Sequence, residues 1–430
     1  MKKNNHNCFN FDKSKHLFKL VFNLMLMSKY CFLIINNKMK NLLIIIALLV
    51  FMLTSCGLEK KNDLRLKAVE DIHFKTKMAF APADAGSFID LVSSKEYFYF
   101  CNKPTDHRIE IFDEKGSFIN AVDIQEVVEQ FGEALLITIV SMDTILFSSF
   151  YTNELIAINS NSEIWFYLNI DSILPEEIQG KHEFMAPPQT SFCCNREALY
   201  YRVFPRFNNL VKIDSINMNC IDDYNLAFYK YFYNSPYFLK LSNYFSDTLS
   251  FEFGLNDIYH QICVENSNFA EGPTYTYIND KLIFYSMFSN SLFIINSDNF
   301  EIEKKIVLNS KYTNIGHPAI TLTKGKVMEQ MRESEKTMEK TGKILRVFYD
   351  NSYFYIILKH QDLLPANLNK SKYLSFFSVI VLNDDFVFVD EFLFDAKEYD
   401  QYSGMMTQKG LAFQKTNTQD GKTYTIFNLF

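Results

Sequence analysis

The sequence has few basic residues, little glycine and a single tryptophan. Of its 430 residues, 43 are lysine or arginine and 50 are aspartate or glutamate, which gives a net charge of -7 and a pI near 5.7. Binding to a nucleic-acid backbone needs a basic surface, so this balance argues against a nucleic-acid partner. With only 13 glycines, most turns must be formed by Asn, Asp and Ser, which tolerate left-handed backbone and bond locally.

Motifs that identify common enzymes and metal sites are also missing. The chain contains no H-E-x-x-H, no phosphate-binding glycine loop, no G-x-S-x-G and no C-x-x-C. Its histidines are scattered, so we expect neither a metal nor a cofactor. The cysteines beyond residue 56 are odd in number, which excludes complete disulfide pairing, and we interpret them as buried thiols with at most one disulfide: Cys101, Cys193, Cys194, Cys220 and Cys263.

The apolar run from Leu42 to Leu53 is too short to span a membrane, which takes about 20 residues. It follows a basic start at Met39 and precedes Thr54-Ser55-Cys56-Gly57, the layout of a secretory signal. The step from Leu53 to Cys56 resembles the lipobox of bacterial lipoproteins, in which the cysteine is diacylated and becomes the new N-terminus. The resemblance implies a chain anchored to a membrane by lipid, such as palmitate, on Cys56.

These features divide the chain into four parts. Residues 1–38 do not form a signal of their own. We interpret them as a segment upstream of the true start codon, which would be that of Met39, and a genuine extra segment of the protein is the alternative. Residues 39–55 form the signal peptide, 56–68 a polar lipidated tether, and 69–430 the domain. The expected location is the bacterial cell envelope, at the outer membrane, with the periplasmic and external faces both open.

A unit of short apolar strands and polar turns recurs along the domain. It is clearest from Tyr275 to Leu308, as three strands, the third ending in Asn, followed by a fourth strand at 302–308. Two more copies run from Phe88 to Ile124 and from Ile137 to Leu168. Weaker copies place strands at 191–194, 199–203 and 210–213, at 345–349, 353–358 and 379–382, and at 411–414 and 424–427.

The repeats predict an all-β fold, a β-propeller of four-stranded blades. The first hairpin turns of the copies, from Glu96 to Asp420, are 47, 54, 83, 70 and 70 residues apart, compared with about 40–50 residues in propeller blades. Six blades fit best. A seventh blade within 229–268 and a two-sheet sandwich are the alternatives. The last copy lacks one strand, which Ile72 to Lys75 is expected to supply, and Thr323 to Lys343 predicts an inserted helix.

With the lipobox and the repeat together, the chain resembles the propeller-like lipoproteins of uncharacterised function found in Bacteroidetes. The residues that carry this resemblance are Leu53 to Cys56, His107 to Gly116, Leu199 to Arg202, and Ile344 to Asp350. The resemblance implies a six-bladed propeller and no catalytic residue.

Five residues form the candidate binding site. Tyr200, Tyr201, Arg202 and Arg206 lie together, and Arg346 occupies a related place in another copy. Arginines beside aromatics suit an anionic or sugar ligand if they face the axis, whereas arginines on blade edges are the alternative. The favoured function is a non-enzymatic binding or scaffold protein with a glycan or peptide ligand. A glycan lyase or hydrolase, and a sensor or structural subunit of an envelope assembly, are the alternatives.

Overall fold

The computed structural model describes residues 65–76, 84–90, 92–132, 135–149, 153–176, 179–180, 182–185, 198–205, 238–246, 248–254, 274–278, 281–285, 289–316, 329, 332–333, 336, 341–360, 376–418 and 421–430. The segment from Arg65 to Phe430 forms one compact unit.

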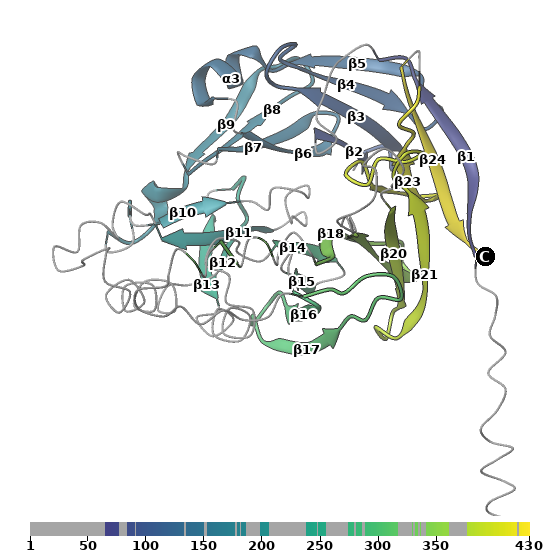
Figure 1. Ribbon diagram of the computed structural model, residues 1–430. Coiled ribbons are helices and arrows are strands. Elements are labelled where there is room, and N and C mark those ends of the chain that lie inside the picture. The colour runs from purple at the N-terminus through teal and green to yellow at the C-terminus, as the bar shows by residue number, and fades with distance from the viewer. Residues whose placement is uncertain are drawn as a thin grey trace, which may run out of the picture. The chain divides into compact units, whose positions relative to one another are not determined.

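Six four-stranded antiparallel sheets make up the described part of this unit, and they follow one another around a ring (Figure 1). Each sheet is one blade, as the sequence predicts. The first three blades consist of β2 (Ala85–Ile89), β3 (Glu96–Asn102), β4 (Arg108–Asp113) and β5 (Phe118–Asp123); β6 (Leu135–Ser141), β7 (Thr144–Ser149), β8 (Glu154–Ile158) and β9 (Ile164–Asn169); and β10 (His182–Met185), β11 (Ala198–Pro205), β12 (Phe238–Ser242) and β13 (Ser250–Gly254).

The second half of the ring repeats this order. Its blades consist of β14 (Thr274–Ile278), β15 (Lys281–Tyr285), β16 (Ser291–Asn296) and β17 (Ile302–Val307); β18 (Lys343–Tyr349), β19 (Tyr353–Lys359), β20 (Phe376–Asn383) and β21 (Phe388–Asp395); and β22 (Met405–Thr407), β23 (Gly410–Gln414) and β24 (Lys422–Leu429), completed by β1 (Leu66–Phe74). The six-bladed propeller is confirmed, and a seven-bladed ring or a sandwich is not what forms.

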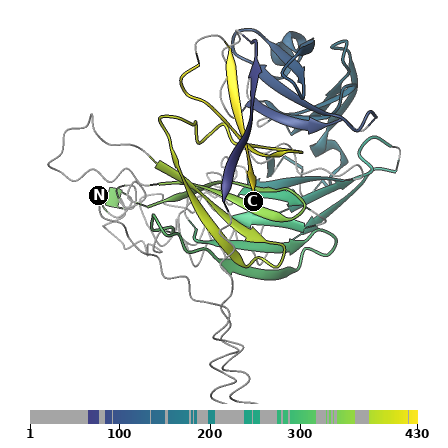
Figure 2. The ribbon, with the colours of Figure 1, turned by 90° about the vertical axis from the view of Figure 1, so that its right-hand side faces the viewer.

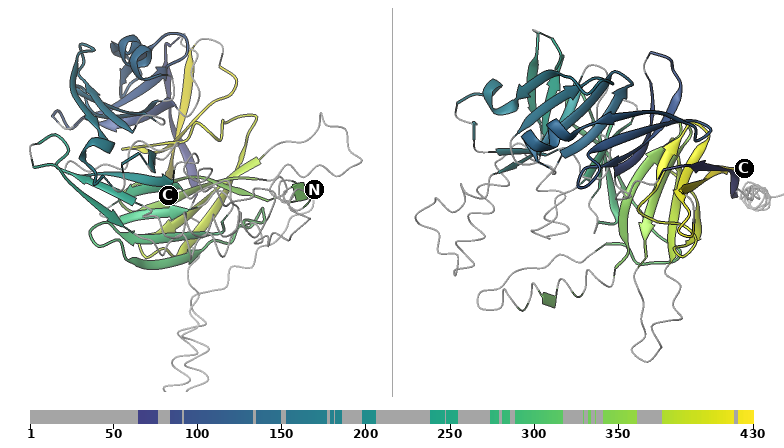
Figure 3. Two further views of the ribbon diagram at one scale, coloured as in Figure 1. Left: turned by 90° about the vertical axis from the view of Figure 1, so that its left-hand side faces the viewer. Right: turned by 90° about the horizontal axis from the view of Figure 1, so that it is seen from above.

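The first strand of the domain closes the ring. β1 pairs with β24 in antiparallel register, from Leu66 opposite Leu429 to Phe74 opposite Lys422, so the sixth blade combines both ends of the domain. Figure 2 shows the purple β1 beside the yellow β24. In Figure 3 the dark blue first blade lies next to the yellow sixth blade, in agreement with the contact between β2 and β22. The predicted closing strand is therefore confirmed, although it begins at Leu66.

Asparagine and aspartate build the turns between third and fourth strands, as the scarcity of glycine predicts. A side-chain oxygen at the end of the third strand accepts hydrogen bonds from backbone N–H groups two and four residues later, an arrangement that fixes a tight turn. The donors are Lys115 and Ser117 for Asp113, Asn161 and Glu163 for Asn159, and Asp385 and Val387 for Asn383.

Apolar side chains fill the spaces between neighbouring blades. The first and second blades share one buried cluster, the fourth and fifth share another, and the sixth blade packs on both the fifth and the first. The first strands of neighbouring blades contact one another, β2 with β6 and β22, and β18 with β22. The first strand of each blade is therefore the innermost one and borders the axis.

The third blade departs from the predicted strand positions. Its first and third strands are His182–Met185 and Phe238–Ser242, whereas the predicted strands 191–194 and 210–213 lie outside the described residues. The strand near Thr248 completes this blade as β13 and forms no blade of its own. Which segments become strands of the third blade is decided by pairing across the long connection between β11 and β12. The local sequence pattern does not reveal this pairing.

Helices play a small part in the described structure. The helix α3 (Gln125–Phe131), which was not predicted from the sequence, buries Val127 and Val128 beside the second blade, and a 3-10 turn covers Ile170–Ile173. Within the predicted helix 323–343, the four described positions 329, 332, 333 and 336 are helical. Its expected end is wrong, because Lys343 already begins β18. In the described ranges, no helix has the length and hydropathy needed to cross a membrane.

Candidate functional site

Arg346 is a buried charge on the innermost strand of the fifth blade. Only 6% of the residue is exposed. Its Nη1 donates a hydrogen bond of 2.6 Å to the carbonyl oxygen of Gly404, which immediately precedes β22 of the sixth blade. A strand bulge between Ile344 and Arg346 interrupts the regular pairing with β19. Such bulges re-aim a side chain, and here the guanidinium crosses from one blade to the next.

Three tyrosines from three other blades lie in the electrostatic neighbourhood of this guanidinium. Tyr99 belongs to the first blade, Tyr285 to the fourth and Tyr424 to the sixth, and all three lie near enough to affect the pKa of Arg346. The fifth blade is not adjacent to the first blade, and the first is not adjacent to the fourth. Residues of these blades can meet only near the axis of the ring. The four side chains therefore mark an axial site.

The electrostatics of the axial site favour a negatively charged ligand. Burial lowers the pKa of Arg346, while the nearby tyrosines and Asp400 raise it, and an arginine keeps its charge throughout. Burial also raises the pKa of Tyr99 and of Tyr424, so their phenols stay protonated. Among the residues that the structure describes, no carboxylate forms an ion pair with Arg346. The site thus combines one buried cation with neutral hydroxyl groups.

Comparison with family models and with curated proteins finds no match. Among solved structures, a member of the DUF4221 family from Bacteroides vulgatus matches with a TM-score of 0.62 and 18% identity, over 86% of this chain and 99% of that chain. The fold is shared. The resemblance to propeller proteins of Bacteroidetes is therefore confirmed at the level of the fold.

Two other solved structures match with lower TM-scores. A Bacteroides fragilis protein named as exported matches with a TM-score of 0.46 and 9% identity, over 85% of this chain and 95% of that chain. A luciferin-regenerating enzyme matches with a TM-score of 0.39 and 7% identity, over 84% of this chain and 95% of that chain. Neither likeness is strong enough to support an argument about the function of this propeller.

The structure separates the predicted site residues. The ring of Tyr201 is buried in the cluster between the second and third blades. That of Tyr200 is buried against the fourth blade, stacked on Tyr277 with 5.3 Å between the ring centroids. Neither ring is among the groups that affect the pKa of Arg346, so the binding argument rests on Arg346 and on Tyr99, Tyr285 and Tyr424.

The remaining predicted residues are described only in part. The backbone of Arg202 lies in β11, while its side chain, Arg206 and Cys56 lie outside the described residues. Cys101 is a buried free thiol, and burial raises its pKa. The other cysteines of the domain also fall outside the described ranges. Within those ranges, no group of three or more His, Cys, Asp or Glu side chains is placed to hold a metal ion.

Gly86 leaves room for the ring of Tyr99, and neither residue was predicted from the sequence to belong to the site. Gly86 pairs with Tyr99 across β2 and β3, and a Cβ atom at Gly86 would lie 2.8 Å from the Tyr99 hydroxyl oxygen. The phenol therefore lies directly over the innermost strand. The available clue was a glycine inside a strand pattern, which indicates close approach by another group.

Replacing Gly86 by alanine is expected to destabilise the propeller by about 1–3 kcal/mol, because the Tyr99 ring must move to make room. Urea unfolding of the wild type and the G86A variant measures this change. In a Y99A background the same substitution should cost less than about 0.5 kcal/mol, since contacting residues couple in a double-mutant cycle. An equal cost in both backgrounds would show that the ring is not the obstacle.

Proposed function

We propose that this chain is a non-enzymatic binding propeller of the bacterial cell envelope that receives an anionic group of its ligand at Arg346. The anchoring part of this proposal rests on the lipobox-like step before Cys56. The binding part rests on one observation, the buried Arg346 guanidinium, which forms no ion pair with a carboxylate of the described residues. A buried charge that lacks an ion-pair partner is costly, and a bound anion would offset this cost.

The surrounding groups favour a carboxylate. An arginine offers five N–H donors in a fork that matches a carboxylate, and one of its nitrogens is already committed to Gly404. The protonated phenol of Tyr99, which lies over the innermost strand of the first blade, adds a further donor near the axis. An acidic sugar of a glycan, or an acidic peptide group, carries such a carboxylate on a body that aromatic rings can contact.

The same groups argue against a lyase. Abstraction of a proton beside a carboxylate by a tyrosine requires a phenol of lowered pKa. At this site burial raises the pKa of Tyr99 and of Tyr424. These two hydroxyl groups therefore suit binding better than catalysis.

The test is the R346M variant, titrated by calorimetry with glucuronate, phosphate and sulfate, with glucose as the neutral probe. The wild type should bind glucuronate in preference to glucose. R346M should weaken this binding by about 100-fold, since truncating one partner of a buried charge pair costs about 2–5 kcal/mol. Without ligand, the free energy of unfolding of R346M should be about 1 kcal/mol higher than that of the wild type, because a buried charge is removed.

Arg108 provides the matched control. It is a half-exposed arginine of the first blade that pairs with Glu110 at 2.8 Å. The R108M variant should bind glucuronate as the wild type does. Equal binding by R346M and the wild type would exclude the axial anion site, and conversion of a glycan substrate by the wild type would exclude the non-enzymatic role.

A further inference from the structure

We propose that the outer face of the second blade binds a partner protein through a segment rich in arginine and lysine. This inference is independent of the axial site, whose proposed ligand carries the opposite charge. The proposed surface, called the rim surface below, consists of β9, α3 and the turn at 243–246 after β12. Figure 1 shows α3 and β9 next to each other at the rim of the ring.

The sequence around the second blade contains no positive charge. From Gly116 to Gly180 there are ten aspartates and glutamates and no lysine, arginine or histidine. The rest of the chain has 43 basic and 40 acidic residues, so this stretch accounts for the net negative charge of the whole protein. A surface of one sign attracts a partner of the opposite sign and speeds their association.

The carboxylates of this stretch are not neutralised within the described part of the chain. Six of them are exposed to water: Asp123, Glu126, Glu129, Asp143, Glu163 and Glu176. None of the six forms an ion pair with a lysine or arginine of the described residues. Carboxylates of other blades do form such pairs, as Glu303 does with Lys281 and Glu70 with Lys409.

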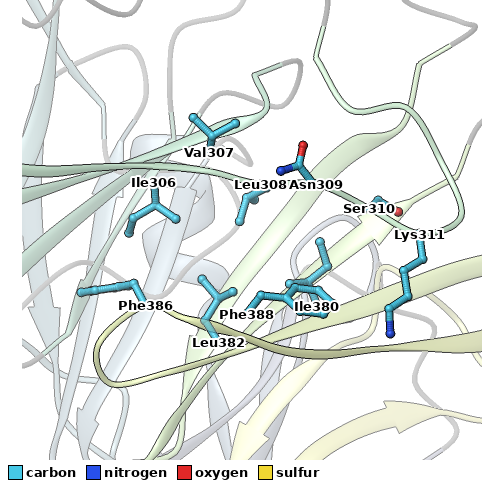
Figure 4. A pocket seen from close by; sticks show the side chains of 10 residues that line it. All are labelled: Ile306, Val307, Leu308, Asn309, Ser310, Lys311, Ile380, Leu382, Phe386 and Phe388. Atoms are coloured by element: carbon cyan, nitrogen blue, oxygen red, sulfur yellow. The ribbon is translucent and has the colours of Figure 1, made fainter. Parts of the chain in front are cut away.

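The boundary between the fourth and fifth blades shows the contrast. A groove of about 320 Å³ lies there, and Lys311 is among the residues that line it (Figure 4). The ammonium group of Lys311 pairs with Asp390, so its charge is neutralised by the chain itself. The exposed carboxylates of the second blade have no such cation beside them among the described residues, and a basic partner would supply one.

Exposed aromatic rings lie on the outermost strand of the same blade. Trp165 is 45% exposed and Tyr167 is 49% exposed, and both project from one face of β9 because they are two positions apart. The ring centroid of Phe245 lies 4.7 Å from that of Trp165, and the ring of Phe131 stacks on that of Tyr167 at 6.0 Å. These four rings form an aromatic strip along β9.

An arginine side chain fits the aromatic strip. A guanidinium stacks on aromatic faces, most strongly on that of tryptophan. In the described residues, no lysine or arginine lies over the ring of Trp165 or Tyr167, whereas Lys359 lies over that of Tyr402. Glu154 accepts a hydrogen bond of 2.6 Å from the Tyr167 hydroxyl group. A guanidinium stacked on Tyr167 would therefore meet a carboxylate as well as a ring.

Other occupants fit the rim surface less well. A metal ion needs several converging ligands, and within the described ranges no three His, Cys, Asp or Glu side chains are placed to hold one. An anionic lipid or an acidic glycan would be repelled by the carboxylates. A neutral glycan could stack on the rings, but it would not neutralise the charge around them. A basic protein segment matches both the rings and the charge.

The test adds a short peptide of alternating arginine and glycine to the purified full chain. Trp165 is the only tryptophan of the protein, so its fluorescence reports contact at the aromatic strip. The emission should change as the peptide binds, and binding should weaken as salt is added, because salt screens exposed charges. A peptide of alternating glutamate and glycine should cause no change. An emission unaffected by the arginine peptide overturns the proposal.

A variant of the tryptophan locates the peptide. By calorimetry, Trp165→Ala should weaken binding of the arginine peptide by about two- to fivefold, the equivalent of an exposed cation–π contact of about 0.5–1 kcal/mol. Trp165→Phe keeps an aromatic face and should restore part of the loss. The matched control is Tyr402→Ala, which removes a 42% exposed ring that already lies under Lys359, and it should bind as the wild type does. Wild-type binding by W165A contradicts the assignment.

A pair of triple variants separates the local charge from the net charge. E126Q/E129Q/E154Q removes three carboxylates at the rim surface and should weaken binding by about tenfold and flatten its dependence on salt. E70Q/E303Q/D390N removes the same charge from three carboxylates that pair with lysines, and it should change binding by less than about twofold. These exposed pairs contribute little to stability. Equal weakening in both variants would show that only the net charge matters, and it overturns the proposal.

Two further measurements test the competing occupants. Cellohexaose is the probe for a neutral glycan, and a change in Trp165 emission with cellohexaose but not with the arginine peptide overturns the proposal. Light scattering across protein concentrations tests a second copy of the chain. Self-association of the wild type that is lost in W165A, without binding of the arginine peptide, also overturns it. Peptide binding to a monomeric wild type, weakened in W165A and kept in Y402A, supports it.

Discussion

Replacing Phe74 by alanine is expected to lower the free energy of unfolding of the propeller by about 3–5 kcal/mol, the usual cost of truncating a buried phenylalanine. Phe74 is fully buried at the end of β1. Its ring lies 5.0–5.4 Å from three phenylalanine rings of the first blade and 5.9 Å from Tyr424 of the sixth. One side chain therefore joins the strand that closes the ring to the blade that begins it.

Denaturant unfolding of the F74A variant measures this effect, and Val69→Ala is the matched control. Val69 lies on the same strand but is 45% exposed, and exposed substitutions usually change stability by less than about 0.5 kcal/mol. A loss below about 1 kcal/mol in F74A would show that the contact between the first and sixth blades contributes little. A loss of the expected size with V69A near wild type would place the closure energy at this aromatic cluster.

Much of the blade architecture could be predicted because it depends on patterns within short stretches of the sequence. In the first, second and fourth blades, apolar runs alternate with turns started by Asp113, Asn159 and Asn296, whose side chains bond the following backbone. A closing strand near Ile72 also follows from the number of strands in each copy of the repeat, since the last copy lacked one strand. These features depend on residues close together in the sequence, where turn chemistry and strand propensity act.

Pairings across long connections could not be predicted in the same way. β11 and β12 are neighbours in the third blade although Pro205 and Phe238 are 33 positions apart. Apolar runs in the intervening stretch were equally good candidate strands. β21 (Phe388–Asp395) was also missed, because its sequence FVDEFLFD mixes charged and apolar residues at an outer strand that is only partly buried.

The axial site was only partly visible in the sequence for a related reason. Arg346 was singled out as an arginine near aromatic residues, but the tyrosines that affect its pKa are Tyr99, Tyr285 and Tyr424, from blades far apart in the chain. The tyrosines next to Arg202 were the obvious partners by sequence, but they are buried in another part of the ring, between the second, third and fourth blades. Convergence at an axis depends on closure of the whole ring, which no local spacing encodes.

Replacing Cys56 by alanine is expected to abolish both the attachment of lipid and the cleavage of the leader. Alanine has no thiol to accept the acyl groups, and processing of the lipoprotein type requires the lipidated cysteine. Labelled palmitate should enter the wild type and be absent from C56A. Peptide mass spectrometry should find the wild type beginning at residue 56 and C56A retaining the residues before it.

Cys101→Ala is the control that separates this site from cysteine chemistry in general. The Cys101 side chain is fully buried, and burial raises the pKa of its thiol, so it lacks the exposed thiolate that reacts. The C101A variant should incorporate palmitate as the wild type does. Because each buried methylene contributes about 0.8 kcal/mol and one acyl chain gives only marginal binding, two or three chains on Cys56 would hold the propeller stably. Equal palmitate in C56A and the wild type would place the anchor elsewhere.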